Sequence, residues 1–230
     1  MVDYTASIKK PFLDIKSFLI GVALSILPIV NWLSLGYALE CTGLTKRKVP
    51  LNKSPDWADW GKLFVNGFLT FVISIIYFIP ALIIFLIALA SVLGAILRVV
   101  SFTDLITGNS AAISQNIASI MPSLASALPF IFIGIVLALL AAYVVQSAVL
   151  NFLVYNRFGK AFSFGEVFKR AFNGTYFVAW IIALIISIVA SLIFSWIPVV
   201  GSALMFFITS VITYTIFGQV YRELGKVKQK

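Results

Sequence analysis

The feature that most constrains this chain is a series of apolar runs, several of them about 18 residues long or longer. A run of that length can cross the hydrocarbon core of a bilayer as an α-helix. The chain of 230 residues is 61% hydrophobic and 11% charged, whereas soluble domains carry about 25% charged residues. Too little polar surface remains to cover a soluble core of this size. These properties predict an all-α, polytopic helical integral membrane protein.

Hydropathy indicates six apolar helices, and we expect them to form a single transmembrane domain over residues 1–230. The expected ranges are 11–27, 29–45, 64–99, 123–155, 173–196 and 199–221. The first two form an N-terminal helical hairpin within residues 1–45, which turns at the sequence LPIVN. Its arms extend roughly 25 Å each, so they either span a thinned bilayer or enter it part way as a re-entrant loop. One broken span is the remaining alternative. Counting both arms, we predict about six transmembrane helices.

Basic residues cluster beside the apolar runs and predict the orientation of the chain. Lysines and arginines precede the first run, follow the second, and recur after the fourth and the sixth. The segments around residues 103–121 and 198–201 carry almost no charge. Because short loops rich in Lys and Arg stay in the cytoplasm, we expect a multi-pass protein of the cell membrane with both termini cytoplasmic. The net charge of +9 favours contact with the lipid bilayer and its anionic headgroups, and we predict no nucleic-acid partner.

The stretch SPDWADWGKLFVNG, residues 54–67, is aromatic and charged in otherwise apolar surroundings. On a helix that starts at Trp57, the aromatic side chains share one stripe and the polar side chains share the opposite face. The stripe contains Trp57 and Trp60, and the polar face contains Asp59, Lys62 and Asn66. This arrangement is typical of a helix lying in the headgroup region. We therefore predict a cytoplasmic interfacial amphipathic helix over residues 54–67.

A similar stretch, SFGEVFKRAFNG, occurs later in the chain at residues 163–174. Both stretches contain an aromatic residue, an acid, an apolar residue, a lysine and Asn-Gly at the same spacing. In the second stretch the matching positions include Phe164, Glu166, Lys169 and Asn173. We predict a second interfacial helix here. We interpret the recurrence as an internal duplication, with chance similarity between two aromatic-rich stretches as the alternative.

The carboxylates of Asp59 and Glu166 each precede a lysine by three residues, a spacing that favours an ion pair on a helix surface. Catalysis would instead require a substrate pocket and a raised pKa. The chain has no histidine and one cysteine, so we predict no enzyme, no catalytic residue, no cofactor and no metal site. Asn66 and Asn173 each precede a glycine. They either join helices at close contact or bend the chain where it enters the membrane.

Two segments resemble the prokaryotic membrane-protein family called domain of unknown function 4013. They are PFLDIKSFLIGVALSILPIVNWLSLGYALE at residues 11–40 and PDWADWGKLFVNGFLTFVISIIYFIPALII at residues 55–84. The matching features are the LPIVN turn, the GYAL helix and the WADWGKLFVNG entry. The resemblance implies a polytopic membrane protein. It implies no activity and no functional residue.

Together, these features favour a non-enzymatic membrane protein that organises lipid or a partner membrane protein through its two interfacial helices. A second copy of the chain is another partner that this interpretation allows. The alternative is a permease or channel-like carrier of a lipid or a small apolar solute, with a cavity between the long helices. A wide continuous cavity would favour the carrier, and a closely packed bundle would favour the first function.

Overall fold

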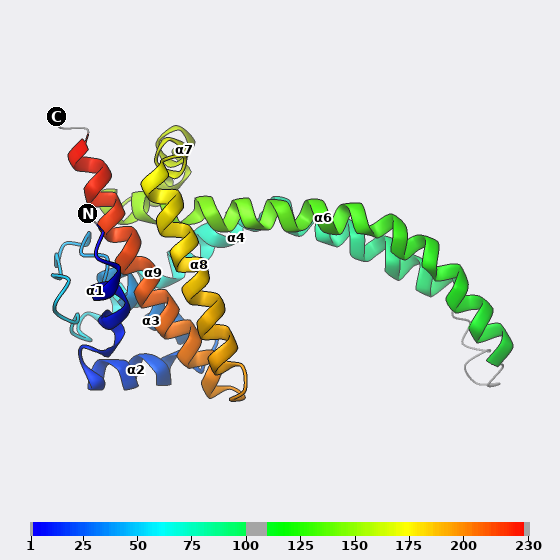
Figure 1. Ribbon diagram of the computed structural model, residues 1–230, viewed down its shortest axis with the longest axis horizontal. Coiled ribbons are helices and arrows are strands. Elements are labelled where there is room, and N and C mark those ends of the chain that lie inside the picture. The colour runs from blue at the N-terminus through cyan, green and yellow to red at the C-terminus, as the bar shows by residue number, and fades with distance from the viewer. Residues whose placement is uncertain (1, 100–109, 228–230) are drawn as a thin grey trace. The chain divides into compact units, whose positions relative to one another are not determined.

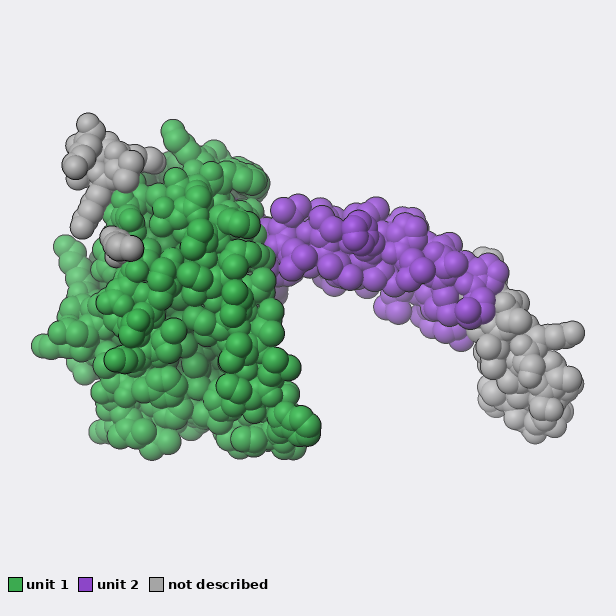
Figure 2. Space-filling model, in the orientation of Figure 1, with its two compact units in different colours: residues 1–74, 143–230 green, residues 75–142 purple. Residues whose placement is uncertain are grey.

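A computed structural model describes residues 2–99 and 110–227 of the chain. Within those ranges every regular element is an α-helix or a short 3-10 helix. The chain forms two compact units, one made of residues 1–74 and 143–230 and the other of residues 75–142 (Figure 2). We call them unit 1 and unit 2. The elements, in chain order, are α1 (Tyr4–Lys9), η1 (Lys10–Phe12), α2 (Ile15–Ser25), α3 (Asn31–Glu40), α4 (Trp60–Val99), α6 (Ser110–Tyr155), η2 (Phe158–Phe162), α7 (Phe164–Ala171), α8 (Gly174–Phe194) and α9 (Val200–Val227).

In the part of the chain that the structure describes, four helices are long and apolar enough to cross a membrane, at positions where the sequence predicted apolar helices. The apolar stretches are Trp60–Gly94 in α4, Met121–Tyr155 in α6, Gly174–Phe194 in α8 and Val200–Gly225 in α9. The first two contain 35 residues each, which is roughly 52 Å of helix against a hydrocarbon core of about 30 Å. Stretches of that length cross a bilayer only if they tilt strongly or extend beyond it.

The N-terminal hairpin is shorter than the sequence predicted. Helices α2 and α3 contain 11 and 10 residues, so each is about 15 Å long and covers half of a bilayer core. Helix α2 begins directly after Asp14. The Asp14 carboxylate caps it by accepting hydrogen bonds from the backbone N–H groups of Lys16 and Ser17. Turns replace the expected helix after Glu40. These lengths do not support two full crossings in residues 1–45. Within residues 2–99 and 110–227, four helices are long and apolar enough to span, against the six that were predicted.

Helix α9 is the centre of unit 1. It packs against α8, α3, α2, α1 and η1, and Figure 1 shows it running beside α8. Its side chains Phe207, Val211 and Phe217 are fully buried. The ring of Phe217 contacts that of Tyr176 on α8, with ring centroids 4.9 Å apart. Unit 1 is thus a bundle built around the last helix of the chain.

Helices α3 and α4 cross at very close range within unit 1. A Cβ atom built on Gly67 would lie 1.9 Å from the carbonyl oxygen of Trp32, and one built on Gly36 would lie 2.0 Å from that of Leu63. One glycine from each helix therefore removes the side chain that would hold the two backbones apart.

A buried lysine fastens the N-terminal segment to the loop between α3 and α4. The ammonium group of Lys10, whose residue is 1% exposed, donates hydrogen bonds to the carbonyl oxygens of Pro50 (2.7 Å), Leu51 (3.2 Å) and Lys53. Three acceptors satisfy all three donors of an ammonium group.

A second contact holds α1 against α9. The side-chain oxygen of Gln219 on α9 accepts a hydrogen bond of 2.8 Å from the backbone N–H of Asp3.

Unit 2 contains the second part of α4 and the first part of α6. The two helices meet where a Cβ atom on Gly134 would lie 2.9 Å from the ring of Phe85. Large apolar side chains are exposed elsewhere on the described part of this unit, including Leu82, Leu86 and Phe132. Exposed apolar surface of this kind suits a lipid environment.

Candidate functional site

The stretch at residues 54–67 begins as an extended loop, and the helix begins only at Trp60. The guanidinium of Arg47 donates hydrogen bonds to the carbonyl oxygens of Asp56 (3.2 Å) and Ala58 (2.9 Å), and so engages the carbonyls that would begin a helix at Trp57. Asp59 has a φ of 61°, in the left-handed region. The predicted helical start at Trp57 is therefore wrong. Helix α4 runs from Trp60 without the separate interfacial segment that the sequence suggested.

The two tryptophans of this stretch lie in different surroundings. Trp57 stacks on Tyr37 with ring centroids 4.4 Å apart, and its indole N–H donates a 3.2 Å hydrogen bond to the carbonyl oxygen of Ser17. Trp60 is 45% exposed. The two rings still lie together, with centroids 5.6 Å apart, although Trp57 stands outside the helix. Trp57 packs into unit 1 and holds the loop against α2 and α3.

The two predicted acid–lysine pairs are replaced by other pairs. Lys62 lies 3.5 Å from the carboxylate of the buried Glu40, rather than beside Asp59. Glu166 lies 3.4 Å from the ammonium of Lys160, rather than beside Lys169. In both cases the partner comes from a different segment of the chain, so the expected pairing along one helix is wrong. Lys169 is left exposed and is paired with no acid among the described residues.

The two Asn-Gly pairs also differ in structure. Asn66 is buried within α4 and Gly67 makes the close crossing with α3. By contrast, the side chain of Asn173 caps α8, accepting a hydrogen bond of 3.0 Å from the backbone N–H of Thr175. A Cβ atom on Gly174 would meet nothing within 4 Å. Close helix contact therefore applies to the first pair and a bend to the second, and the two similar stretches have different local structures.

Helix α7 is a separate amphipathic helix at the predicted position. Val167 and Ala171 are buried, and the Ser147 hydroxyl of α6 donates a 3.0 Å hydrogen bond to the carbonyl oxygen of Val167. A second face carries exposed rings at every fourth residue, with centroids about 6 Å apart. These rings belong to Phe164, Phe168 and Phe172, which we call the phenylalanine stripe. The basic side chains of the helix lie away from this stripe.

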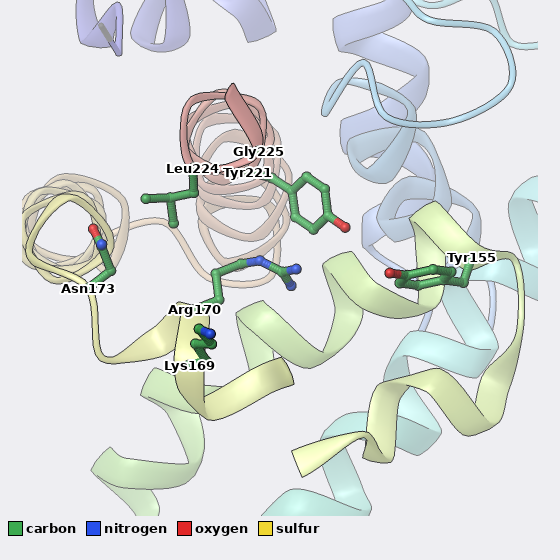
Figure 3. Close-up of a pocket in the computed structure, with 7 residues that line it drawn as sticks. All are labelled: Tyr155, Lys169, Arg170, Asn173, Tyr221, Leu224 and Gly225. Atoms are coloured by element: carbon green, nitrogen blue, oxygen red, sulfur yellow. The ribbon is translucent and has the colours of Figure 1, made fainter. Parts of the chain in front are cut away.

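A pocket of about 350 Å³ lies beside α7, in the size range of ligand sites. We call it the first pocket (Figure 3). It brings together the end of α6, the end of α7, the cap of α8 and the last turns of α9. Its lining residues are Tyr155, Lys169, Arg170, Asn173, Tyr221, Leu224 and Gly225. Of the residues singled out from the sequence, only Lys169 and Asn173 line it.

The first pocket is basic and its arginine is held in place. The guanidinium of Arg170 donates a hydrogen bond to the side-chain oxygen of Asn151 and lies 4.1 Å from the centre of the Tyr221 ring. In Figure 3 the hydroxyl groups of Tyr155 and Tyr221 face the same space as this guanidinium. Two cations and two hydroxyl groups suit an anionic oxygen ligand such as a phosphate. Neither Asp59 nor Glu166 lines the pocket, so the site lacks the carboxylates that headgroup catalysis by those acids would use.

Sequence reasoning missed Tyr155, Arg170 and Tyr221 as members of a site. They lie on three different helices and share no spacing in the sequence. The signal that could have found them is the position of each one at the end of a helix, where aromatic and basic residues gather in membrane proteins.

Comparison with known proteins identifies a family. A family model described as Protein of unknown function (DUF4013) matches residues 19–199. This match extends beyond the segments that carried the resemblance in the sequence. No curated protein and no solved structure matches the chain.

Proposed function

The chain belongs to the DUF4013 family, and on that premise we propose that it is a non-enzymatic membrane protein that binds anionic lipid headgroups in the first pocket. It crosses the cell membrane four times, with α4, α6, α8 and α9, and keeps both termini in the cytoplasm. By holding such lipids at the cytoplasmic face it organises the lipid around the bundle. The observation that carries the proposal is the pairing of a fixed guanidinium with the free ammonium of Lys169 in one pocket.

The distribution of charge supports this orientation. The first pocket lies at the end of unit 1 that also carries the basic segment at residues 157–170 and the C-terminal end of α9. Basic segments beside apolar helices stay in the cytoplasm, where the leaflet is rich in anionic lipid. Four crossings keep the termini on one side, as six would. The short α2–α3 hairpin then enters the bilayer part way as a re-entrant element.

The phenylalanine stripe would allow α7 to lie in the headgroup region with its apolar face toward the acyl chains. Phe172 is 73% exposed and lies directly before the cap of α8. An apolar stripe buried at the boundary of headgroups and acyl chains would place Lys169 and Arg170 at phosphate depth. This placement supports an interfacial role for α7. The described residues 41–59, directly before α4, contain no equivalent helix.

The position of the pocket favours headgroup binding over the carriage of an apolar solute. It lies at the ends of α6 and α9 and is lined by basic and tyrosine side chains. A carrier would need a cavity among the apolar middle turns of the spans. The close crossing of α3 and α4 and the buried rings of α9 describe a tightly packed bundle at unit 1 instead.

Native mass spectrometry of the full chain in detergent tests the proposal, with phosphatidylglycerol and phosphatidylcholine as probes at equal concentration. We expect phosphatidylglycerol to be retained preferentially. Lys169→Ala should weaken its retention by about fivefold, because one basic side chain near the phosphates contributes about 1 kcal/mol. Lys46→Ala is the matched control, since Lys46 is exposed and does not line the pocket.

A second variant separates pocket binding from general surface attraction. Gly225 lines the pocket, and a Cβ atom there would meet nothing within 4 Å. Gly225→Leu should therefore fill the pocket without removing charge, and retention of phosphatidylglycerol should fall. Equal retention of both lipids by the natural protein, or equal losses in Lys169→Ala and Lys46→Ala, would overturn the proposal.

A further inference from the structure

A second basic pocket, of about 410 Å³, adjoins the first. We call it the second pocket. It lies between α9, the end of α6 and the loop that follows α3. Its basic side chains are Lys48 and Arg222. Arg222 reaches the loop, since a Cβ atom on Gly43 would lie 2.7 Å from one of its guanidinium nitrogens.

The two pockets share a wall. Tyr221 and Gly225 line both of them, one turn apart on α9. Lys169 and Arg170 lie in the first pocket, and Lys48 and Arg222 lie in the second. None of the described residues that line either pocket is acidic. The two pairs of cations thus lie on either side of the end of α9, and Glu223, the acid of this turn, lines neither pocket.

We propose that the paired pockets select a lipid whose headgroup carries two phosphates, with one phosphate in each pocket. This inference rests on the proposed function and adds the chemical class of lipid. A lipid with a single phosphate occupies one pair of cations and leaves the other pair to water and salt. A headgroup that links two phosphates brings the second to its pocket at high effective concentration once the first is bound, so the affinity exceeds that of either phosphate alone.

The shared glycine suits this linked arrangement. A side chain at position 225 would project into space that is open in both pockets, because nothing lies within 4 Å of a Cβ atom there. The absence of that side chain leaves room for the link between the two phosphates to pass over the helix. The ring of Tyr221 packs against the Arg170 guanidinium and lines both pockets where they adjoin.

Competition between lipids tests the inference on the full chain in detergent by native mass spectrometry. The probes are diphosphatidylglycerol, phosphatidylglycerol and phosphatidylcholine, compared at equal phosphate concentration. We expect diphosphatidylglycerol to be retained on the order of tenfold more strongly than phosphatidylglycerol. The double variant Lys48→Gln/Arg222→Gln should remove this preference and leave retention of phosphatidylglycerol close to that of the natural protein. Lys9→Gln/Lys46→Gln removes the same charge at two exposed residues that line neither pocket, and it should preserve the preference.

The outcomes distinguish this inference from the function on which it rests. If phosphatidylglycerol and diphosphatidylglycerol bind equally and both exceed phosphatidylcholine, the two-phosphate inference fails and the proposed function stands. If no anionic lipid exceeds phosphatidylcholine, both fail. Equal loss of preference in the two double variants also overturns the inference, because it would show that only net charge matters. Soluble glycerol bisphosphate serves as a further competitor, and displacement of lipid at equal concentration would assign the site to a soluble anion instead.

Discussion

At the scale of single residues, Cys41 shows that the turn after α3 is shielded from solvent. Its side chain is buried, and this burial raises the pKa of the thiol to about 12 from an ordinary 9.0. The ammonium of Lys10 acts in the opposite direction on this pKa and does not overcome the burial. The folded protein therefore keeps the thiol protonated, which favours folding below about pH 9 and loses its effect as the pH rises toward 12.

Labelling of Cys41 is a direct test of this burial. Maleimide at about pH 8 should react slowly with the folded protein in detergent and completely after denaturation, because the thiolate is the reactive form. Raising the pH to about 10 should accelerate labelling of the unfolded chain while labelling of the folded chain stays slow. Cys41 is the chain's single cysteine, so the natural protein needs no substitution. Rapid labelling of folded protein at about pH 8 would show that the turn after α3 is open.

Charged residues explain where local sequence rules failed at this scale. The spacing of Asp59 and Lys62 predicted a pair along one helix, yet Lys62 pairs with Glu40. Glu40 is fully buried, and a buried carboxylate without a partner costs far more than an exposed one. The cost of burying Glu40 without a partner therefore favours its pairing with Lys62. The spacing of neighbours along the chain carries no information about such a partner.

At the scale of elements, the sequence predicted best those helices that carry their own signal. The apolar lengths of α4, α6, α8 and α9 and the amphipathic pattern of α7 are properties of single segments. The start of α4 depends instead on Arg47, which reaches the carbonyls at residues 56 and 58 from another part of the loop. Element type was thus predictable, and element ends set by tertiary contacts were not.

The crossing of α3 and α4 gives a prediction at this scale. Gly67→Ala should lower the stability of the protein by about 1–3 kcal/mol, because the added methyl group overlaps the carbonyl of Trp32 and forces the helices apart. The midpoint of thermal unfolding, followed by labelling of Cys41, measures the effect. Gly61→Ala in the same helix is the control, since a Cβ atom there meets nothing within 4 Å. Equal stability of the two variants would contradict the close crossing.

At the scale of the whole molecule, the two pockets exist only because distant segments meet. Their basic residues come from the loop after α3, from α7 and from α9. The sequence showed that basic residues gather beside the spans. That pattern predicts which side of the membrane a loop occupies. It could not predict which of them share a pocket, since that depends on how the bundle packs. Lys169 and Asn173 were found because they lie in a recurring motif, whereas Lys48 and Arg222 have no such pattern.

The orientation of the molecule can be tested across a single span. In a Cys41→Ala background, Trp196→Cys should react with an impermeant maleimide on intact cells, and Gly165→Cys should react only after permeabilisation. Of the four helices that can span, α8 is the one that lies between the two positions. Trp196 is 86% exposed and a Cβ atom on Gly165 meets nothing within 4 Å, so both sites accept the substitution and the reagent. Labelling of both positions from the same side would exclude a crossing by α8.

The anchoring of Lys10 has a practical consequence for producing this protein. Its ammonium donates hydrogen bonds to the carbonyl groups of Pro50, Leu51 and Lys53. Trimming the N-terminus beyond Lys10 would strand those carbonyls and free the loop that carries Lys48 and Arg47. An affinity tag should therefore leave Lys10 and the segment that carries it in place, because this segment holds the loop at residues 50–53.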